Sequence, residues 1–131
     1  DGACPPLYVD ELTRRCMGST SLAVLLLDKF ERQLLDDLEE LQRRFEARDT
    51  VQISRTAHSL KGAAGTVAAP AVRELAAGIE ALARQGALEP IATELLALRE
   101  EVDRCIAYLP AARTALSSPP AASPEEAPPA P

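Results

Sequence analysis

The sequence is poor in the residues from which metal sites, disulfide frameworks and aromatic cores are built. It has one histidine, no tryptophan and only 3% aromatic residues, so its core must consist of leucine, alanine, valine and isoleucine. The three cysteines, Cys4, Cys16 and Cys105, are odd in number and lack the spacing of metal ligands. A structural zinc site is therefore excluded, and we expect free thiols in a reducing compartment.

Long apolar runs and an excess of positive charge are missing as well. No run approaches the ~18 apolar residues of a membrane-spanning helix, and no signal-peptide pattern is present. The net charge of −6 argues against a nucleic-acid backbone as a partner. We therefore expect a cytoplasmic protein that binds neither membranes nor nucleic acids.

The 131 residues are enough for one domain. Because the chain begins at Asp1 rather than at methionine, we expect a fragment or a processed form.

Proline is distributed unevenly and divides the chain into three parts. Six of the eleven prolines lie in residues 117–131, a segment without any large apolar residue. Such a segment cannot offset its ordering entropy by burial, so we expect a disordered tail or linker. Residues 1–6 resemble the end of another linker. The folded domain is expected over residues 7–116.

Within that domain the apolar residues recur at helical spacing, and no stretch shows strand-like alternation. The pattern predicts an all-α fold, an antiparallel four-helix bundle preceded by a short extra helix over residues 9–15. The four long helices are expected to start at the cap candidates Ser19, Thr20 and Ser21, at Asp49 (with Gln52 as in a capping box), at Pro70 and at Pro90. In the same order, they are expected to end at about Arg48, Ala68, Gly86 and Pro110. The predicted core positions are Phe30, Leu34, Leu38, Leu41, Phe45, Ile53, Ala57, Leu60, Ala64, Val67, Val72, Leu75, Ile79, Leu82, Ile91, Leu95, Leu98, Val102, Ile106 and Leu109.

The single histidine, His58, falls on the second of the four helices. At 100° per residue it lies about 140° from Ile53 at the centre of the apolar stripe, so it should face solvent or a partner. Its neighbours on the helix surface are Ser54, Arg55, Lys61, Gly62 and Gly65. These positions hold cations and no carboxylate, and nearby cations favour the neutral, nucleophilic ring.

Two mid-helix glycines on the histidine face are unusual, because each costs about 1 kcal/mol relative to alanine. Gly62 and Gly65 could let another helix of the bundle approach closely. They could instead clear the surface beside the ring for a partner. A lone histidine on a helix is usually a plain surface residue. A histidine, a lysine one turn on and a cleared surface together predict a site that accepts an anion and admits another protein.

These residues carry a family resemblance. The segment Ala57-His58-Ser59-Leu60-Lys61-Gly62-Ala63-Ala64-Gly65 resembles the signature of histidine-containing phosphotransfer (HPt) domains of bacterial phosphorelays, which reads H-x-L/I-K-G-x-A/S on the second helix of a four-helix bundle. The resemblance extends over about residues 7–109. It includes the opening Pro6–Leu12, Phe30 in the first long helix, and Leu75, Ile79, Glu80 and Leu82 in the third. One departure is Ala68, where the family often has glycine.

The resemblance implies a phosphorelay intermediate. His58 would accept a phosphoryl group through Nε2 from the aspartyl phosphate of one receiver domain and pass it to the aspartate of another. Lys61 would neutralise the phosphoryl oxygens, and Arg84 on the third helix could also reach them. Gly62 would permit close approach as part of a docking surface formed by Ser54, Arg55, Gly62 and Gly65. The metal and the acidic cluster belong to the receiver. We therefore expect no metal or cofactor in this chain, no independent kinase activity, and a monomer, with proline-rich flanks that favour a module tethered to a hybrid sensor kinase.

Two other classes of protein compete with this interpretation. Dimerisation domains of histidine kinases also carry a surface histidine, but they normally place an acidic residue directly after it, where this chain has Ser59. A helical adaptor without chemistry would show the same amphipathic stripes. An enzyme with its own active site is not supported, because there is one histidine and no cysteine in an activating context.

Overall fold

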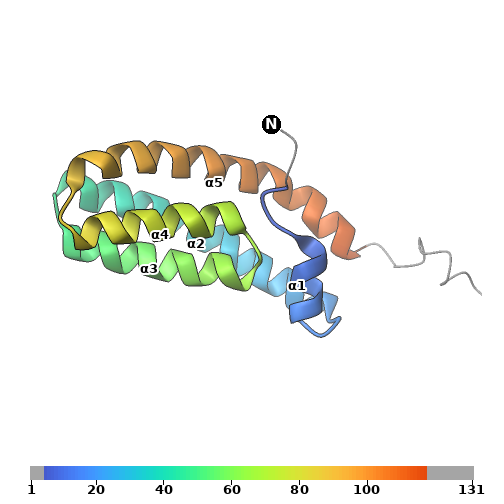
Figure 1. Cartoon of the computed structure of the whole chain (residues 1–131). Helices are drawn as coiled ribbons and strands as arrows, with labels where there is room; N and C mark the ends of the chain where they lie inside the picture. The colour runs from blue at the N-terminus through green and yellow to red at the C-terminus, as the bar shows by residue number, and fades with distance from the viewer. Residues whose placement is uncertain (1–4, 118–131) are drawn as a thin grey trace, which may run out of the picture.

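The computed structural model describes residues 5–117, which form five helices and no strand (Figure 1). Four long helices lie side by side, and a short first helix crosses one end of the bundle (Figure 1). The helices are α1 (Val9–Arg15), α2 (Thr20–Glu46), α3 (Thr50–Thr66), α4 (Pro70–Arg84) and α5 (Leu88–Ser117). The predicted all-α bundle with an extra N-terminal helix is confirmed.

The starts of α2, α3 and α4 follow the local signals in the sequence, whereas α5 begins at Leu88, two residues before the predicted start at Pro90. The side chain of Ser19 accepts a hydrogen bond from the Leu22 amide at 3.1 Å, and the side chain of Asp49 accepts one from the Gln52 amide at 3.2 Å. Each cap satisfies one amide of a first turn that has no partner within the helix. Pro70 occupies the first turn of α4, as predicted.

Two predicted helix ends are confirmed only in part. Gly86 follows α4 with a φ of 71°, the left-handed conformation expected after a helix C-cap. α2 ends at Glu46 and α3 at Thr66, each two residues before the predicted end. In both cases a residue in the left-handed region follows, Arg48 with φ 59° and Ala68 with φ 61°.

The prediction that Pro110 ends or kinks the last helix is wrong about the end. α5 continues through Pro110 to Ser117. Beyond the proline, Ala112 and Leu116 are buried, and Arg113 reaches across to α2. The Arg113 guanidinium bonds the Asp28 carboxylate at 3.1 Å and also binds Glu31. These tertiary contacts stabilise the end of α5 and so offset the helical hydrogen bond that Pro110 cannot donate.

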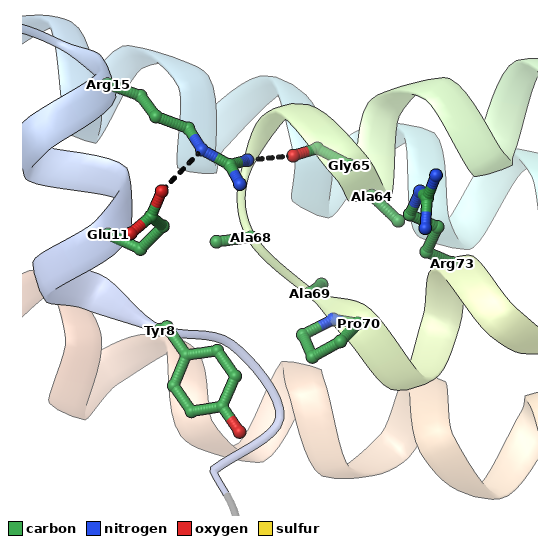
Figure 2. Close-up of a pocket in the computed structure, with 9 residues that line it drawn as sticks. All are labelled: Tyr8, Glu11, Arg15, Ala64, Gly65, Ala68, Ala69, Pro70 and Arg73. Carbon is green, nitrogen blue, oxygen red and sulfur yellow. Dashed lines mark hydrogen bonds and ion pairs between the residues drawn. The ribbon is translucent and has the colours of Figure 1, made fainter.

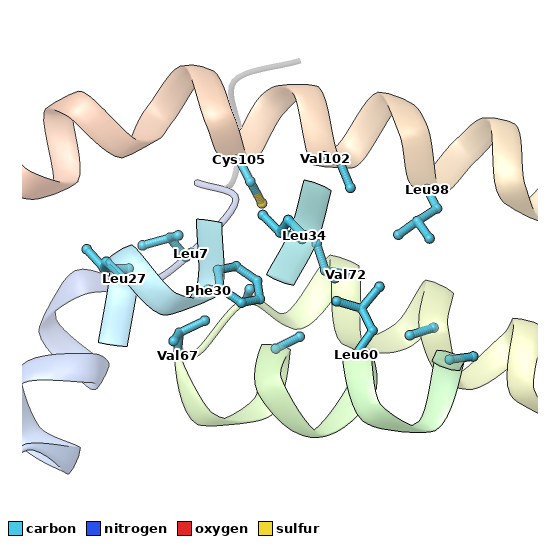
Figure 3. Close-up of a cluster of buried hydrophobic side chains, with 14 of the residues drawn as sticks. Leu7, Leu27, Phe30, Leu34, Leu60, Val67, Val72, Leu98, Val102 and Cys105 are labelled. Atoms are coloured by element: carbon cyan, nitrogen blue, oxygen red, sulfur yellow. The ribbon is translucent and has the colours of Figure 1, made fainter. Parts of the chain in front are cut away.

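The core lies between α2, α3, α4 and α5 and is almost entirely aliphatic, with Phe30 as its largest side chain (Figure 3). The four predicted core residues within α3 are buried, and so is Val67 directly after its end. Five positions predicted for the core are only partly buried at its margin: Leu38, Phe45, Leu75, Leu82 and Ile106. Pro6 and Leu7 are also buried. The described residues include only Ser117 of the predicted tail and only residues 5 and 6 of the predicted linker.

Two of the three cysteines lie in the described part of the chain, and both are free and buried. They are Cys16 and Cys105, as the odd cysteine count led us to expect. Burial raises the pKa of the Cys105 thiol to about 12, so it stays protonated at neutral pH. Cys4 lies outside the described residues.

Ala68 stands where the HPt family often has glycine, and its backbone has a positive φ of 61°. A substitution by glycine is therefore expected to stabilise the fold. A left-handed conformation costs an L-residue roughly 1–2 kcal/mol, and Tyr8 holds this turn in place by donating its amide to the Ala68 carbonyl at 2.9 Å. Glycine removes that cost but adds unfolded-state entropy and loses the burial of the Ala68 methyl group, since Ala68 is only 7% exposed. We expect Ala68→Gly to raise the free energy of unfolding by up to about 1 kcal/mol, measured by chemical denaturation. Ala69→Gly is the matched control. Ala69 is fully buried at φ −111°, so this variant loses packing without strain relief and should melt earlier. A lower stability for Ala68→Gly than for the wild type would contradict the account.

Candidate functional site

His58 lies near the middle of α3 on the side turned away from the core. Its side chain is 65% exposed, which confirms the outward orientation predicted from the helical wheel. The buried stripe of α3 includes Ile53, Ala57 and Leu60, and it fixes the rotation of the helix about its axis. The packing of α3 therefore holds the imidazole at the surface.

A buried carboxylate from α4 lies behind the ring. The Glu80 side chain is only 4% exposed, and its Oε2 is 2.9 Å from His58 Nδ1. Glu80 Oε1 is 2.9 Å from Lys61 Nζ, and Oε2 is also 2.7 Å from the Arg84 guanidinium. The sequence thus predicted three site residues, His58, Lys61 and Arg84, that contact one carboxylate. It did not predict that carboxylate, Glu80, as a site residue.

The charge around the ring corrects the sequence-based interpretation. That interpretation found only cations beside His58 because it considered positions on the same helix. Glu80 comes from the neighbouring helix and adds a negative charge in direct contact with the ring. The positions on α3 hold no carboxylate, as predicted, but the neighbouring helix supplies one, so the same-helix positions alone do not describe the charge around the ring.

The ionised Glu80 fixes which ring nitrogen is free. The hydrogen bond from Lys61 holds the pKa of Glu80 below its ordinary value of 4.5, against the opposing effect of burial. An ionised carboxylate can only accept hydrogen bonds, so His58 Nδ1 must be the donor. In the neutral ring the lone pair then lies on Nε2, the ring nitrogen that does not bond Glu80. A nitrogen with such a lone pair can act chemically as a hydrogen-bond acceptor or as a nucleophile.

A signal for Glu80 was present in the sequence. The sequence analysis named Glu80 only as a residue that fits the family's third helix. Glu80 nevertheless lies on the apolar stripe of α4, whose buried positions are Val72, Ala76, Ile79, Glu80 and Ala83. A carboxylate at such a position needs cationic or hydrogen-bonding partners, and His58 and Lys61 are one helix away. A charged residue inside an apolar stripe is the pattern that points to this contact.

The two glycines of the motif lie in different surroundings. No heavy atom lies within 4 Å of the position that a Cβ would take at Gly62, so no neighbouring helix requires glycine there. At Gly65 a Cβ would lie 3.5 Å from the Arg73 side chain. Gly62 therefore leaves open surface one turn from His58, whereas Gly65 lies two turns away against α4.

Gly65 belongs to a hollow where α1 meets the turn between α3 and α4. Figure 2 shows Arg15 reaching from α1 to the carbonyl of Gly65, with Glu11 on its other side. The same arginine approaches the Thr66 carbonyl at 3.5 Å. Arg15 thus adds a side-chain donor at the C-terminal end of α3, where the Gly65 carbonyl also accepts the Ala68 amide at 3.3 Å.

Ser54 and Arg55 lie on the other side of His58 and line a shallow hollow between the start of α3 and the end of α4. Arg84 lines the same hollow. α2 approaches from the flank, where Gln33 donates to the Ser59 hydroxyl and the Asp37 carboxylate, each at 3.0 Å. Burial raises the pKa of Asp37 above its ordinary value. The bond from Gln33 to Ser59 attaches α2 to α3 beside the histidine, whereas the bond to Asp37 lies within α2.

A helical bundle that presents the free nitrogen of one oriented histidine is suited to carrying a group between proteins rather than to enclosing a substrate. The comparison with protein families agrees with this class. Residues 25–108 match the model of the Hpt domain, which is well over half of the chain, so the chain belongs to the Hpt domain family. The family acts in histidine phosphotransfer within phosphorelays, where its members interact with receiver domains and kinases. The comparisons with curated proteins and with solved structures returned no match.

Two further findings concern residues 5–117. None of the helices in this part of the chain is long and apolar enough to cross a membrane. In the same residues, no group of three or more histidine, cysteine, aspartate and glutamate side chains is placed to hold a metal ion.

Proposed function

We propose that this chain is a phosphorelay intermediate whose phosphoacceptor is His58. It takes a phosphoryl group from the aspartyl phosphate of one receiver domain and passes it to the aspartate of another. The observation that carries the proposal is the contact of the exposed His58 ring, through Nδ1, with the buried Glu80 carboxylate at 2.9 Å.

In the proposed reaction the Nε2 lone pair of His58 attacks the phosphorus of the aspartyl phosphate. The bond from phosphorus to the aspartate oxygen breaks, and the electron pair leaves with the receiver's carboxylate. The product ring bears a phosphoryl group on Nε2 and a proton on Nδ1, so it is positively charged. Glu80 stabilises that charge through the Nδ1 hydrogen bond. Onward transfer reverses these steps, with the second receiver's carboxylate as nucleophile and the neutral ring as leaving group.

Lys61 and Arg84 supply positive charge for the phosphoryl oxygens in this proposal. In the present structure both bind Glu80. The lysine has a flexible four-carbon stem, and the Arg84 side chain is 67% exposed, so both can turn toward a group on Nε2. Phosphoryl transfer depends mainly on such positioning and charge neutralisation. Ser54, Arg55, Gly62 and Gly65 form the docking surface. The chain acts as a monomer in a bacterial cytoplasm, as a module tethered to a hybrid sensor kinase.

The proposal is tested by profiling phosphotransfer. Purified receiver domains from the source organism are phosphorylated with radiolabelled acetyl phosphate and incubated with this protein. We expect at least one receiver to transfer label that is labile in acid and stable in alkali, as phosphohistidine is. Peptide mass spectrometry should place it on His58. Absence of transfer from every receiver, or label on another residue, would overturn the proposal.

Because Lys61 contacts a buried carboxylate, we expect its replacement to affect both stability and phosphotransfer. Lys61→Ala leaves Glu80 with fewer partners, so it should lower the free energy of unfolding by about 1–2 kcal/mol as well as slow phosphotransfer. In a Glu80→Gln background the carboxylate is gone, and the same lysine substitution should cost little stability while still slowing transfer. Chemical denaturation and single-turnover transfer of all four proteins measure the two effects. Equal transfer rates with and without Lys61 in the Glu80→Gln background would remove the lysine from the mechanism.

A further inference from the structure

The charge of this protein is divided unequally between its surfaces. The chain carries −6 overall, yet α3 contains no aspartate or glutamate along its whole length. Together α3 and α4 hold four basic and two acidic residues, and one of those acids, Glu80, is buried. α2 holds seven acidic and four basic residues. The histidine thus lies on a positive surface of an acidic molecule.

Two arginines on this surface are not neutralised by a partner. Lys61 and Arg84 are paired with Glu80. Arg55 and Arg73 are both exposed, and neither forms an ion pair or hydrogen bond within residues 5–117. Their charges are therefore exposed to solvent and are not compensated by a carboxylate within the described residues.

The positions of the two arginines bracket the reacting group. Arg55 precedes His58 by one turn and lines the hollow at the start of α3. Arg73 lies against Gly65, two turns after His58, at the hollow seen in Figure 2. Gly62, between them, leaves the surface open. We call Arg55, His58, Gly62 and Arg73 the docking stripe.

Charges in this arrangement act on a partner before contact. A positive stripe attracts an acidic surface, and the acidic remainder of the molecule repels the same surface from other approaches. Attraction of this kind extends about one Debye length, roughly 10 Å at 0.1 M salt. It therefore sets the rate and orientation of encounter.

We propose that Arg55 and Arg73 steer and select the receiver, so that the preferred partner has acidic residues on both sides of its phosphorylated aspartate. This inference rests on the proposed function and adds to it the kind of receiver surface that docks. Receivers with neutral or basic surroundings at those two places are discriminated against by slower association.

The test uses the receiver that transfers fastest in the phosphotransfer profile. The second-order transfer rate is measured by rapid quench at receiver concentrations far below saturation, over salt concentrations from about 20 to 500 mM. We expect Arg55→Glu and Arg73→Glu each to lower this rate three- to tenfold at the lowest salt, as order-of-magnitude figures for the loss of steering. The differences should shrink toward zero at the highest salt, where the Debye length falls to a few ångströms. Arg55→Gln and Arg73→Gln should show smaller reductions in the same direction.

Arg32→Glu is the matched control, because it makes the same charge change at an exposed residue of α2 that is not on the docking stripe. It should lower the rate by less than twofold. Equal slowing by Arg32→Glu would show that only net charge matters and would overturn the inference. So would a salt-independent effect, or faster transfer by Arg55→Glu. If His58 is labelled normally and the arginine variants match the wild type, this inference fails alone. If no receiver transfers, the proposed function fails and this inference falls with it.

Discussion

Replacement of His58 by glutamine should abolish uptake of acid-labile phosphoryl label, a loss of at least about 1,000-fold. Glutamine keeps a helix-forming side chain with an amide that can donate to Glu80, but it has no nucleophilic nitrogen. The fold should therefore survive, because the His58 side chain is largely exposed and does not contribute to the core. Circular dichroism and labelling from the phosphorylated receiver measure the two properties.

The control for this prediction is Ser59→Ala, at the neighbouring position. Ser59 carries a hydroxyl that accepts a bond from Gln33, and it is the nearest alternative acceptor in the sequence. Loss of that hydroxyl should leave acid-labile labelling in place. Retention of acid-labile label by His58→Gln would refute the central proposal.

Gly62→Gln should give a protein that is stable, helical and deficient in transfer. Since no atom lies within 4 Å of a Cβ at this position, the new side chain meets no clash, and glutamine's better helix propensity should raise stability by up to about 1 kcal/mol. The same side chain would stand one turn from the His58 ring and hold the receiver away. A displacement of ~1 Å in the reacting geometry can cost ~100-fold in rate, so we expect a loss of that order. A thermal melt and the transfer rate from the receiver test both parts.

Two other glycines serve as comparisons for Gly62. Gly65→Gln should have a milder effect on transfer, because position 65 lies two turns from His58, and it should gain less stability, because its side chain meets Arg73. Gly78→Ala on α4 makes a similar helix-favouring change away from the docking stripe, where the new Cβ would lie 3.7 Å from Glu94. It should be stabilised and transfer normally. A Gly62→Gln protein that melts early, or that transfers at the wild-type rate, would show that Gly62 does not face the partner.

The features predicted correctly from sequence are those that depend on neighbours in the chain. The caps at Ser19 and Asp49 and the first-turn Pro70 involve residues within one helical turn, so local sequence is enough to recognise them. The outward orientation of His58 also follows from the period of its own helix. The sole departure noted from the family pattern, Ala68, identified a backbone position with positive φ.

The features that were missed depend on contacts between helices. Glu80 lies 22 residues after His58, and no wheel drawn for α3 contains it. The continuation of α5 past Pro110 similarly depends on Arg113 bonding to α2, 82 and 85 residues away in sequence. Sequence patterns predict which face of a helix is apolar. They do not specify which polar side chain of a neighbouring helix will lie opposite a given residue.

The cluster around Glu80 also has a consequence for the reversibility of the proposed relay. In the present structure the buried carboxylate binds Lys61 and accepts a hydrogen bond from Nδ1 of the His58 ring beside it. Once the ring bears a phosphoryl group it becomes a cation itself, and Lys61 can leave for the phosphoryl oxygens without stranding Glu80. One positive partner replaces another at the same buried site. The carboxylate therefore keeps a positive partner in both forms of the protein, so that neither loading nor unloading leaves it without one, and transfer can proceed in either direction.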